Sequence, residues 1–166
     1  MKLRLSDSAD VEPIRRLIHA TIEASYAGVY SPRAVQHFKE FHSADRIRER
    51  QAAGAVLVAE LDGQMVATGA IVGADISGVF VHPEFQKRGI GGQVMDNLEG
   101  AAERAGRDSV RLDVSLPSRS FYESRGYRLL ESCSIDVGEG ERLDYWTAEK
   151  RLDSDEAREA LPKGES

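Results

Sequence analysis

Gln86-Lys87-Arg88-Gly89-Ile90-Gly91-Gly92 is the heptapeptide from which the organisation of this 166-residue chain can be worked out. The run before it, Ile76-Ser77-Gly78-Val79-Phe80-Val81, is rich in β-branched and aromatic residues, which predicts a strand. After it, apolar side chains recur at helical spacing, at Val94, Met95, Leu98, Ala101 and Ala102. The heptapeptide is therefore predicted to be a tight turn from a strand into an amphipathic helix.

Such a turn is a favourable place for an anion. The first turn of a helix carries backbone N–H groups without partners and the positive end of the macrodipole, and glycines let a ligand approach them closely. Lys87 and Arg88 add positive charge beside Gly89, so the turn predicts a diphosphate site, with a plain strand-to-helix turn as the alternative. The segment has neither the P-loop pattern Gly-x-x-x-x-Gly-Lys-Ser/Thr nor the dinucleotide pattern Gly-x-Gly-x-x-Gly.

What remains is Gln-x-x-Gly-x-Gly after a Val-x-Pro-like strand end, and this resembles the GNAT superfamily of acyl-CoA-dependent N-acyltransferases. The matching stretch runs from Val79 to Gly91. A second block, Phe121-Tyr122 followed by Gly126-Tyr127, is similar to the family's Phe-Tyr pair one strand and one helix further on. The resemblance covers residues 1–152 and is strongest in 76–128. It departs from the family at Pro117, where many relatives carry Asn, which puts one side-chain contact to the cofactor in doubt.

The resemblance and the order of elements imply an α/β (α+β) fold: a mixed, mostly antiparallel twisted sheet with one splayed parallel strand pair, flanked by helices. A right-handed crossover through the helix at 90–104 should place the strands at 75–81 and 109–114 side by side. Asp62-Gly63 between two apolar runs predicts a hairpin. The other expected elements are a strand at Leu3 to Leu5, helices at 11–22 and 32–38, the hairpin strands 55–60 and 65–72, and terminal strands at 127–130 and 143–150.

We expect one domain over residues 1–152, because a 41% hydrophobic composition can furnish a single core. Residues 153–166 are charged and poor in large apolar groups, which predicts a mobile tail.

Charge and composition exclude several function classes. With 22 basic and 28 acidic residues and no basic cluster among aromatic residues, nucleic acid is not an expected partner. No apolar run is long enough for a membrane span and the start has no export core, so we expect no membrane partner and a cytoplasmic location. Cys133 is the single cysteine, and the histidines have no ligand spacing, so no disulfide and no metal are expected.

The resemblance implies acetyl-CoA as co-substrate. Backbone groups of Phe80 and Val81 would pair with pantetheine as an added strand, and one of their N–H groups would polarise the thioester carbonyl. The predicted cofactor-binding residues are Phe80, Val81, Gln86, Lys87, Arg88, Gly89, Ile90, Gly91 and Gly92.

Two residues are candidates for proton transfer. Tyr122 lies where relatives place a general acid, and its phenol would protonate the departing sulfur, unless it is only a core aromatic. Asp75 corresponds loosely to a carboxylate of relatives and is the candidate base, with a turn residue as the alternative. Glu84 is expected to be solvated, and His82 is expected to hydrogen-bond within its turn.

The function implied is transfer of an acetyl group from acetyl-CoA to a primary amine of a small molecule or peptide, by direct attack and a tetrahedral intermediate. Tyr26, Tyr30 and Phe38 are candidates for an acceptor wall, with core packing as the alternative for each. A catalytically inactive CoA-binding sensor or interaction module of the same fold stays open, as do a longer acyl donor and a homodimer.

Overall fold

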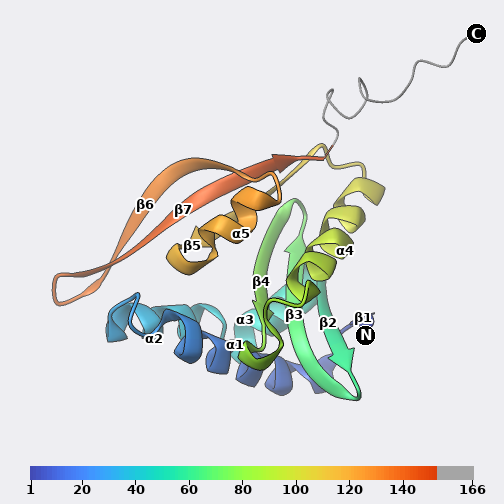
Figure 1. The fold of residues 1–166 in the computed structure, drawn as a ribbon, viewed down its shortest axis with the longest axis horizontal. Helices are drawn as coiled ribbons and strands as arrows, with labels where there is room; N and C mark the ends of the chain where they lie inside the picture. The colour runs from blue at the N-terminus through green and yellow to red at the C-terminus, as the bar shows by residue number, and fades with distance from the viewer. Residues whose placement is uncertain (153–166) are drawn as a thin grey trace, which may run out of the picture.

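The computed structural model describes residues 1–152, and the predicted mobile tail, 153–166, lies outside the described residues. A seven-stranded sheet in the order β1-β2-β3-β4-β5-β7-β6 forms the centre of the fold (Figure 1). The strands are β1 Lys2–Leu5, β2 Ala55–Leu61, β3 Gln64–Val72, β4 Asp75–Val81, β5 Ser109–Ser115, β6 Arg128–Gly138 and β7 Glu141–Arg151. The helices are α1 Val11–Tyr26, α2 Pro32–Phe41, α3 Ala44–Ala53, α4 Ile90–Arg104 and α5 Arg119–Ser124, with short 3-10 turns η1 Ser8–Asp10, η2 Pro83–Phe85 and η3 Leu116–Ser118.

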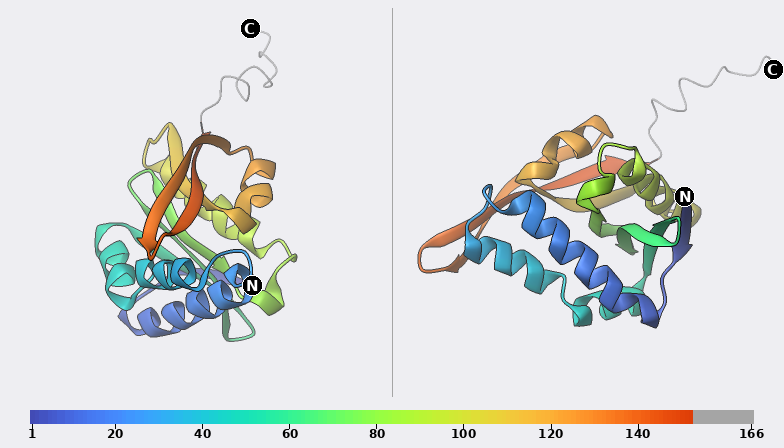
Figure 2. Two further views of the ribbon diagram at one scale, coloured as in Figure 1. Left: turned by 90° about the vertical axis from the view of Figure 1, so that its left-hand side faces the viewer. Right: turned by 60° about the horizontal axis from the view of Figure 1, so that its bottom comes forward.

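Helices cover both faces of the sheet, which gives two hydrophobic clusters. On one face α4 packs against β3, β4 and β5 through side chains such as Val94, Met95 and Leu98. On the other face α1, α2 and α3 pack against alternate residues of the same sheet, including Val56 and Val58. The helices of the first third, coloured blue to cyan, gather on one side, away from α4 and α5 (Figure 2). The predicted α/β fold with a mostly antiparallel sheet is confirmed.

β4 and β5 are the parallel pair, and they separate almost at once. The register joins them only at Asp75 and Arg111, where the Arg111 N–H donates to the Ala74 carbonyl at 2.9 Å. β5 pairs instead with β7 along its whole length, from Ser109 to Ser115. The sheet therefore opens between β4 and β5 beyond Asp75.

A β-bulge adds to this opening. Thr68 of β3 lies opposite Phe80, but Ala70 lies opposite Ser77, so β4 carries one extra residue between those two pairs. Gly78 falls in that interval with a φ of 62°, a left-handed conformation that glycine adopts without steric cost. The bulge bends β4 at the point where it has already lost β5 as a neighbour.

The β6–β7 hairpin is longer than the predicted 127–130 and 143–150, since both strands have 11 residues. It extends past β5 to lie over α2 (Figure 1), and Ile135 and Leu143 join the cluster formed by the first three helices. Helix α3 was not predicted; it begins after the N-cap Ser43 and buries only Ile47.

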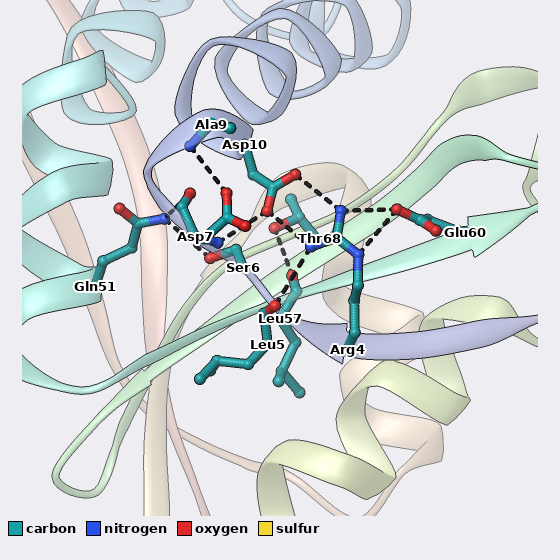
Figure 3. A network of polar contacts seen from close by, with 10 residues as sticks. All are labelled: Arg4, Leu5, Ser6, Asp7, Ala9, Asp10, Gln51, Leu57, Glu60 and Thr68. Atoms are coloured by element: carbon teal, nitrogen blue, oxygen red, sulfur yellow. Dashed lines mark hydrogen bonds and ion pairs between the residues drawn. The ribbon is translucent and has the colours of Figure 1, made fainter.

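A polar network fixes the amino-terminal strand to the start of α1 and to β2 (Figure 3). The Arg4 guanidinium donates to the Asp10 carboxylate at 2.7 and 2.8 Å and to Glu60 at 2.9 and 2.7 Å. Asp7 and Asp10 form a capping box. The Asp7 carboxylate accepts from the Ala9 N–H at 2.9 Å, and the Asp10 carboxylate accepts from the Asp7 N–H at 2.8 Å. Among residues 1–152, no helix combines the length and apolarity that a bilayer crossing requires.

Candidate active site

The turn predicted to hold phosphate joins η2 to the first turn of α4. Its backbone bends sharply because Lys87 and Gly89, on either side of Arg88, both have left-handed conformations, with φ of 63° and 81°. A left-handed lysine costs about 1 kcal/mol or more and persists only where the surroundings enforce it. The Gln86 side chain stabilises the turn by donating a hydrogen bond to the Val81 carbonyl at the end of β4, at 3.0 Å. The first N–H groups of a 15-residue helix are thereby held at the end of β4.

The three glycines of this turn have different surroundings. A Cβ added at Gly89 would meet no atom within 4 Å, so the space above it is open. At Gly91 a Cβ would touch Phe121 and Val81 at 3.4 Å, and at Gly92 it would lie 3.3 Å from the Arg125 side chain. Gly91 and Gly92 therefore allow close packing, whereas Gly89 leaves room for a ligand next to the helix N-terminus.

A cavity of about 700 Å³ runs from this turn along β4 to α5. All the predicted cofactor residues line it except Arg88, whose guanidinium lies over the Phe85 ring, 5.1 Å from its centroid. Pro117 also lines the cavity and offers no side-chain hydrogen-bonding group there. We call this space the cofactor cavity; the structure brings the predicted cofactor set together around it.

A second cavity of about 250 Å³ lies at the gap between β4 and β5, and its lining also includes residues of α2 and of the β6–β7 hairpin. We call it the acceptor cavity. It shares five lining residues with the cofactor cavity: Tyr26, Val79, Phe80, Ser118 and Tyr122. The two cavities therefore meet across the residues that follow the bulge of β4.

Tyr122 stands at this junction. It lies on α5 with its side chain buried, in edge contact with the rings of Phe121 and Tyr127 at 5.0 and 5.5 Å. Burial, with the nearby Tyr26 phenol, raises the pKa of Tyr122. The phenol is therefore protonated at neutral pH, as a proton donor must be.

Three hydroxyl groups form a chain beside Tyr122. The Ser115 Oγ donates to the Tyr26 hydroxyl at 2.9 Å and lies 2.7 Å from the Ser118 Oγ. Because Ser115 has one hydrogen and gives it to Tyr26, Ser118 donates to Ser115. Burial raises the pKa of Tyr26. The two serines were missed from the sequence, in which small polar residues after a strand predict only a turn.

The aromatic residues proposed for the acceptor wall divide into two roles. Tyr26 and Phe38 line the acceptor cavity, with ring centroids 4.9 Å apart. Tyr30 does not line it: its hydroxyl accepts from the Leu116 N–H at 2.8 Å and donates to the Asp144 carbonyl at 2.8 Å. Tyr30 thus fastens the loop between α1 and α2 to the end of β5 and to β7.

The structure places the two candidate carboxylates differently. Asp75 is exposed at the closed end of the strand gap and lines neither cavity. Asp113, two residues after Arg111 on β5, lines the acceptor cavity and was missed from the sequence. Its side chain stays partly exposed, but the cavity walls desolvate the carboxylate, and this burial together with the charge of Asp75 raises the pKa of Asp113. A raised pKa suits a carboxylate that must take up a proton near neutrality.

A buried histidine at the end of α2, His42, also lines the acceptor cavity. Burial, followed by the nearby charge of Arg50, lowers the pKa of His42 to about 3, so its ring is neutral. Its Nδ1 lies 3.0 Å from Arg50 Nη1, and its ring packs edge-on against Phe80 at 5.1 Å. Arg50 has no carboxylate within salt-bridge distance in the described chain, and burial lowers the pKa of Arg50 to about 10.

Outside the two cavities, His82 has the structural role expected of it: its Nδ1 accepts from the Glu84 N–H at 3.1 Å and caps η2. Residues 1–152 contain no group of three His, Cys, Asp or Glu side chains arranged to hold a metal ion.

Known proteins resemble this chain in both sequence and fold. Residues 26–138 match the family described as "Acetyltransferase (GNAT) domain". A GCN5-related N-acetyltransferase from Rhodopseudomonas palustris is 25% identical, with a TM-score of 0.82 over 90% of this chain and 94% of that one. PaiA N-acetyltransferase from Thermoplasma acidophilum, solved with coenzyme A, is 19% identical over 91% of this chain and 99% of its own, with a TM-score of 0.68. YncA from Salmonella typhimurium, solved with acetyl-CoA, is 20% identical over 99% and 98%, with a TM-score of 0.66. Because the family match spans more than half of its residues, this chain belongs to the GNAT family of acetyltransferases.

Proposed function

We propose that this protein is an N-acetyltransferase that moves an acetyl group from acetyl-CoA to a primary amine of a small molecule or peptide. The observation that carries the proposal is the meeting of two cavities at Phe80 and Tyr122, one of which runs to a helix N-terminus. Direct transfer between two substrates needs both reacting groups to be held on either side of such a shared boundary. We assign this activity to residues 1–152 and to the cytoplasm.

The residues around the cofactor cavity fit coenzyme A. The N–H groups that open α4 are suited to the diphosphate, and the open space at Gly89 lets it approach them. Beyond Asp75, β4 has an edge with no strand register to β5, which suits the amide groups of pantetheine. The structures of PaiA with coenzyme A and of YncA with acetyl-CoA support this assignment.

Acetyl-CoA supplies an acetyl group activated as a thioester. A backbone N–H after the bulge, at Phe80 or Val81, would polarise the thioester carbonyl. The amine attacks in its neutral form, after its ammonium form has lost one proton to solvent. As the nitrogen bonds to the carbonyl carbon, a second proton passes to a carboxylate; Asp75 is the residue predicted for this, and Asp113 is the one that lines the acceptor cavity. Tyr122 gives its proton to the sulfur as the carbon–sulfur bond breaks, so that coenzyme A leaves as a thiol, and solvent then restores both groups.

The test is release of free thiol from acetyl-CoA in the presence of a panel of primary amines, with binding of coenzyme A measured separately by calorimetry. We expect thiol release that depends on the amine, together with an acetylated product seen by mass spectrometry. Binding of coenzyme A without thiol release for any amine would instead favour the inactive sensor. Comparison of acetyl-CoA with longer acyl-CoA donors in the same assay defines the donor.

A further inference from the structure

The acceptor cavity has features that restrict which amines fit it, and this inference rests on the proposed function. Its volume of about 250 Å³ is small beside the roughly 300–1,000 Å³ usual for ligand pockets. Its walls are mostly apolar: Phe38 comes from α2, Phe80 from β4, and Leu143 and Tyr145 from the hairpin. Such walls suit a compact hydrocarbon body, aromatic or branched, because each apolar contact removes surface from water.

The charges around the cavity point to a single positive group on that body. Asp113 is the one carboxylate among the lining residues in the described chain, so one ammonium can be neutralised there. Beside the β4 wall, His42 at the end of α2 is neutral, and the Arg50 guanidinium lies 3.1 Å from the position that a Cβ on Gly78 would occupy. A second ammonium reaching this wall would meet an unpaired positive charge in a partly desolvated place.

We propose that the acceptor is a compact, singly charged primary amine with an apolar body, whose ammonium group is received by Asp113. Arg50 excludes diamines and polyamines by repulsion across Gly78. The narrow cavity, closed on two sides by α2 and the hairpin, admits a side chain of this size more readily than the amino terminus of a peptide with its flanking polar backbone.

The test compares two amines of nearly the same shape that differ by one charge, 4-methylbenzylamine and 1,4-bis(aminomethyl)benzene, with a short peptide amide as the third acceptor. We expect kcat/KM for the monoamine to exceed that for the diamine by about tenfold or more, from one charge repulsion at an effective dielectric of about 20. In Arg50→Met the values of kcat/KM for the two amines should become similar. In Arg50→Lys, which keeps the positive charge, the difference between the two values should remain.

Asp113→Asn adds a second arm, since it should raise KM for the monoamine while affinity for coenzyme A stays unchanged. A diamine or peptide turned over as well as the monoamine by the wild-type protein would overturn the inference. An Arg50→Met variant with an unchanged ratio of kcat/KM between the monoamine and the diamine would also overturn it. Failure of the proposed function is distinguishable from both, because coenzyme A would then bind and no amine at all would release thiol.

Discussion

Asp75 and Arg111 form the one register pair between β4 and β5 in residues 1–152, and the two strands separate beyond it. A parallel pair normally continues in evenly spaced hydrogen bonds. Here β5 keeps its full register with β7, while β4 keeps its register with β3 and bulges at Gly78. The sheet thus divides into two parts that are joined at Asp75, and residues of both parts line the acceptor cavity.

The position of Asp75 allows the catalytic base to be identified by its pH dependence. Burial and the charge of Asp75 raise the pKa of Asp113, and a base acts only when it is deprotonated, so the raised pKa moves the acid limb of kcat/KM to higher pH. Asp113→Asn should remove that limb and lower kcat by about 10²–10⁴-fold. Asp75→Asn removes a like charge, so the limb should move to lower pH with kcat largely kept.

The reverse pattern would assign the base to Asp75, as predicted from the sequence. Steady-state rates at saturating acetyl-CoA, measured across the acid and neutral range for both variants, separate the two outcomes. Thermal unfolding of each variant checks that the fold is intact.

Tyr122→Phe removes one hydroxyl from the junction of the two cavities. We expect kcat to fall by about 10²-fold or more, because sulfur then leaves as a thiolate without a proton, while the affinity for coenzyme A changes little. Tyr127→Phe, on the neighbouring ring, is the matched control and should keep turnover. Wild-type turnover in Tyr122→Phe would remove this phenol from the mechanism.

Gly89→Gln should block the cofactor cavity. Its side chain would occupy the open space next to the first turn of α4, so the affinity for coenzyme A should fall by about tenfold or more. Gly106→Gln is the control: Gly106 has nearly the same φ, 79° against 81°, and equally open surroundings, but it follows the other end of α4. In both variants the free energy of unfolding should fall by about 1–2 kcal/mol, because glutamine must adopt the left-handed conformation.

Calorimetric titration with coenzyme A separates blocking from strain, because strain is common to the two glycines. Equal loss of affinity in both variants would show that the site does not lie at Gly89.

His42 makes the stability of the fold depend on pH. Its pKa is about 3 in the folded protein, mainly through burial, against about 6.5 in the unfolded chain. Between these values the unfolded state binds more protons, so the free energy of unfolding falls as the pH drops below about 6.5, by up to about 1.4 kcal/mol per pH unit. Urea unfolding of wild type and His42→Gln between about pH 5 and pH 8 measures this slope.

The slope should be smaller in His42→Gln. His37→Gln is the control, because His37 is a half-buried histidine of α2, the helix that His42 caps. It shows the effect of removing a histidine near the cavity. An identical slope in wild type and His42→Gln would contradict the assignment.

Asp10 contributes to stability through its contacts with Arg4 and the Asp7 backbone. The hydrogen bonds from Arg4 lower the pKa of Asp10 to about 2, so its contribution is present above about pH 4 and is lost as the pH falls through about 2. Asp10→Asn should cost about 1–3 kcal/mol at neutral pH, because it removes the negative charge that accepts two hydrogen bonds from Arg4. Asp7→Asn should cost little, since Asn caps as well as Asp. Chemical unfolding of the two variants gives the comparison, and equal stability would contradict it.

The residue types along the chain were sufficient to predict the elements that build the cofactor cavity. Gly89 has the left-handed conformation that the tight turn needs, and Asp62-Gly63 turns the hairpin with φ of 52° and 76°, as the type I′ pattern predicts. In each case the residue type itself limits the backbone, so the structure follows from neighbours along the chain.

Other parts of the site depend on packing that the sequence does not reveal. Asp113 sits in a strand between the buried Leu112 and Val114, and it lines a cavity at a level where β5 no longer has a register with β4. Helix α3 escaped prediction because a single buried residue, Ile47, gives too little apolar periodicity. The length of the hairpin was not predicted because β6 is mostly polar and exposed until it reaches α2, so it lacks the apolar alternation of a buried strand.

The boundary shared by the two cavities has a kinetic consequence. Because Tyr26, Phe80 and Tyr122 line both cavities, we expect each substrate to form part of the enclosure around the other. An amine that arrives first finds a chamber open toward the donor side and escapes quickly, whereas one that arrives after acetyl-CoA is enclosed. If the proposed sites are occupied as inferred, we expect a compulsory sequence, with the thioester first to arrive and the free thiol last to depart.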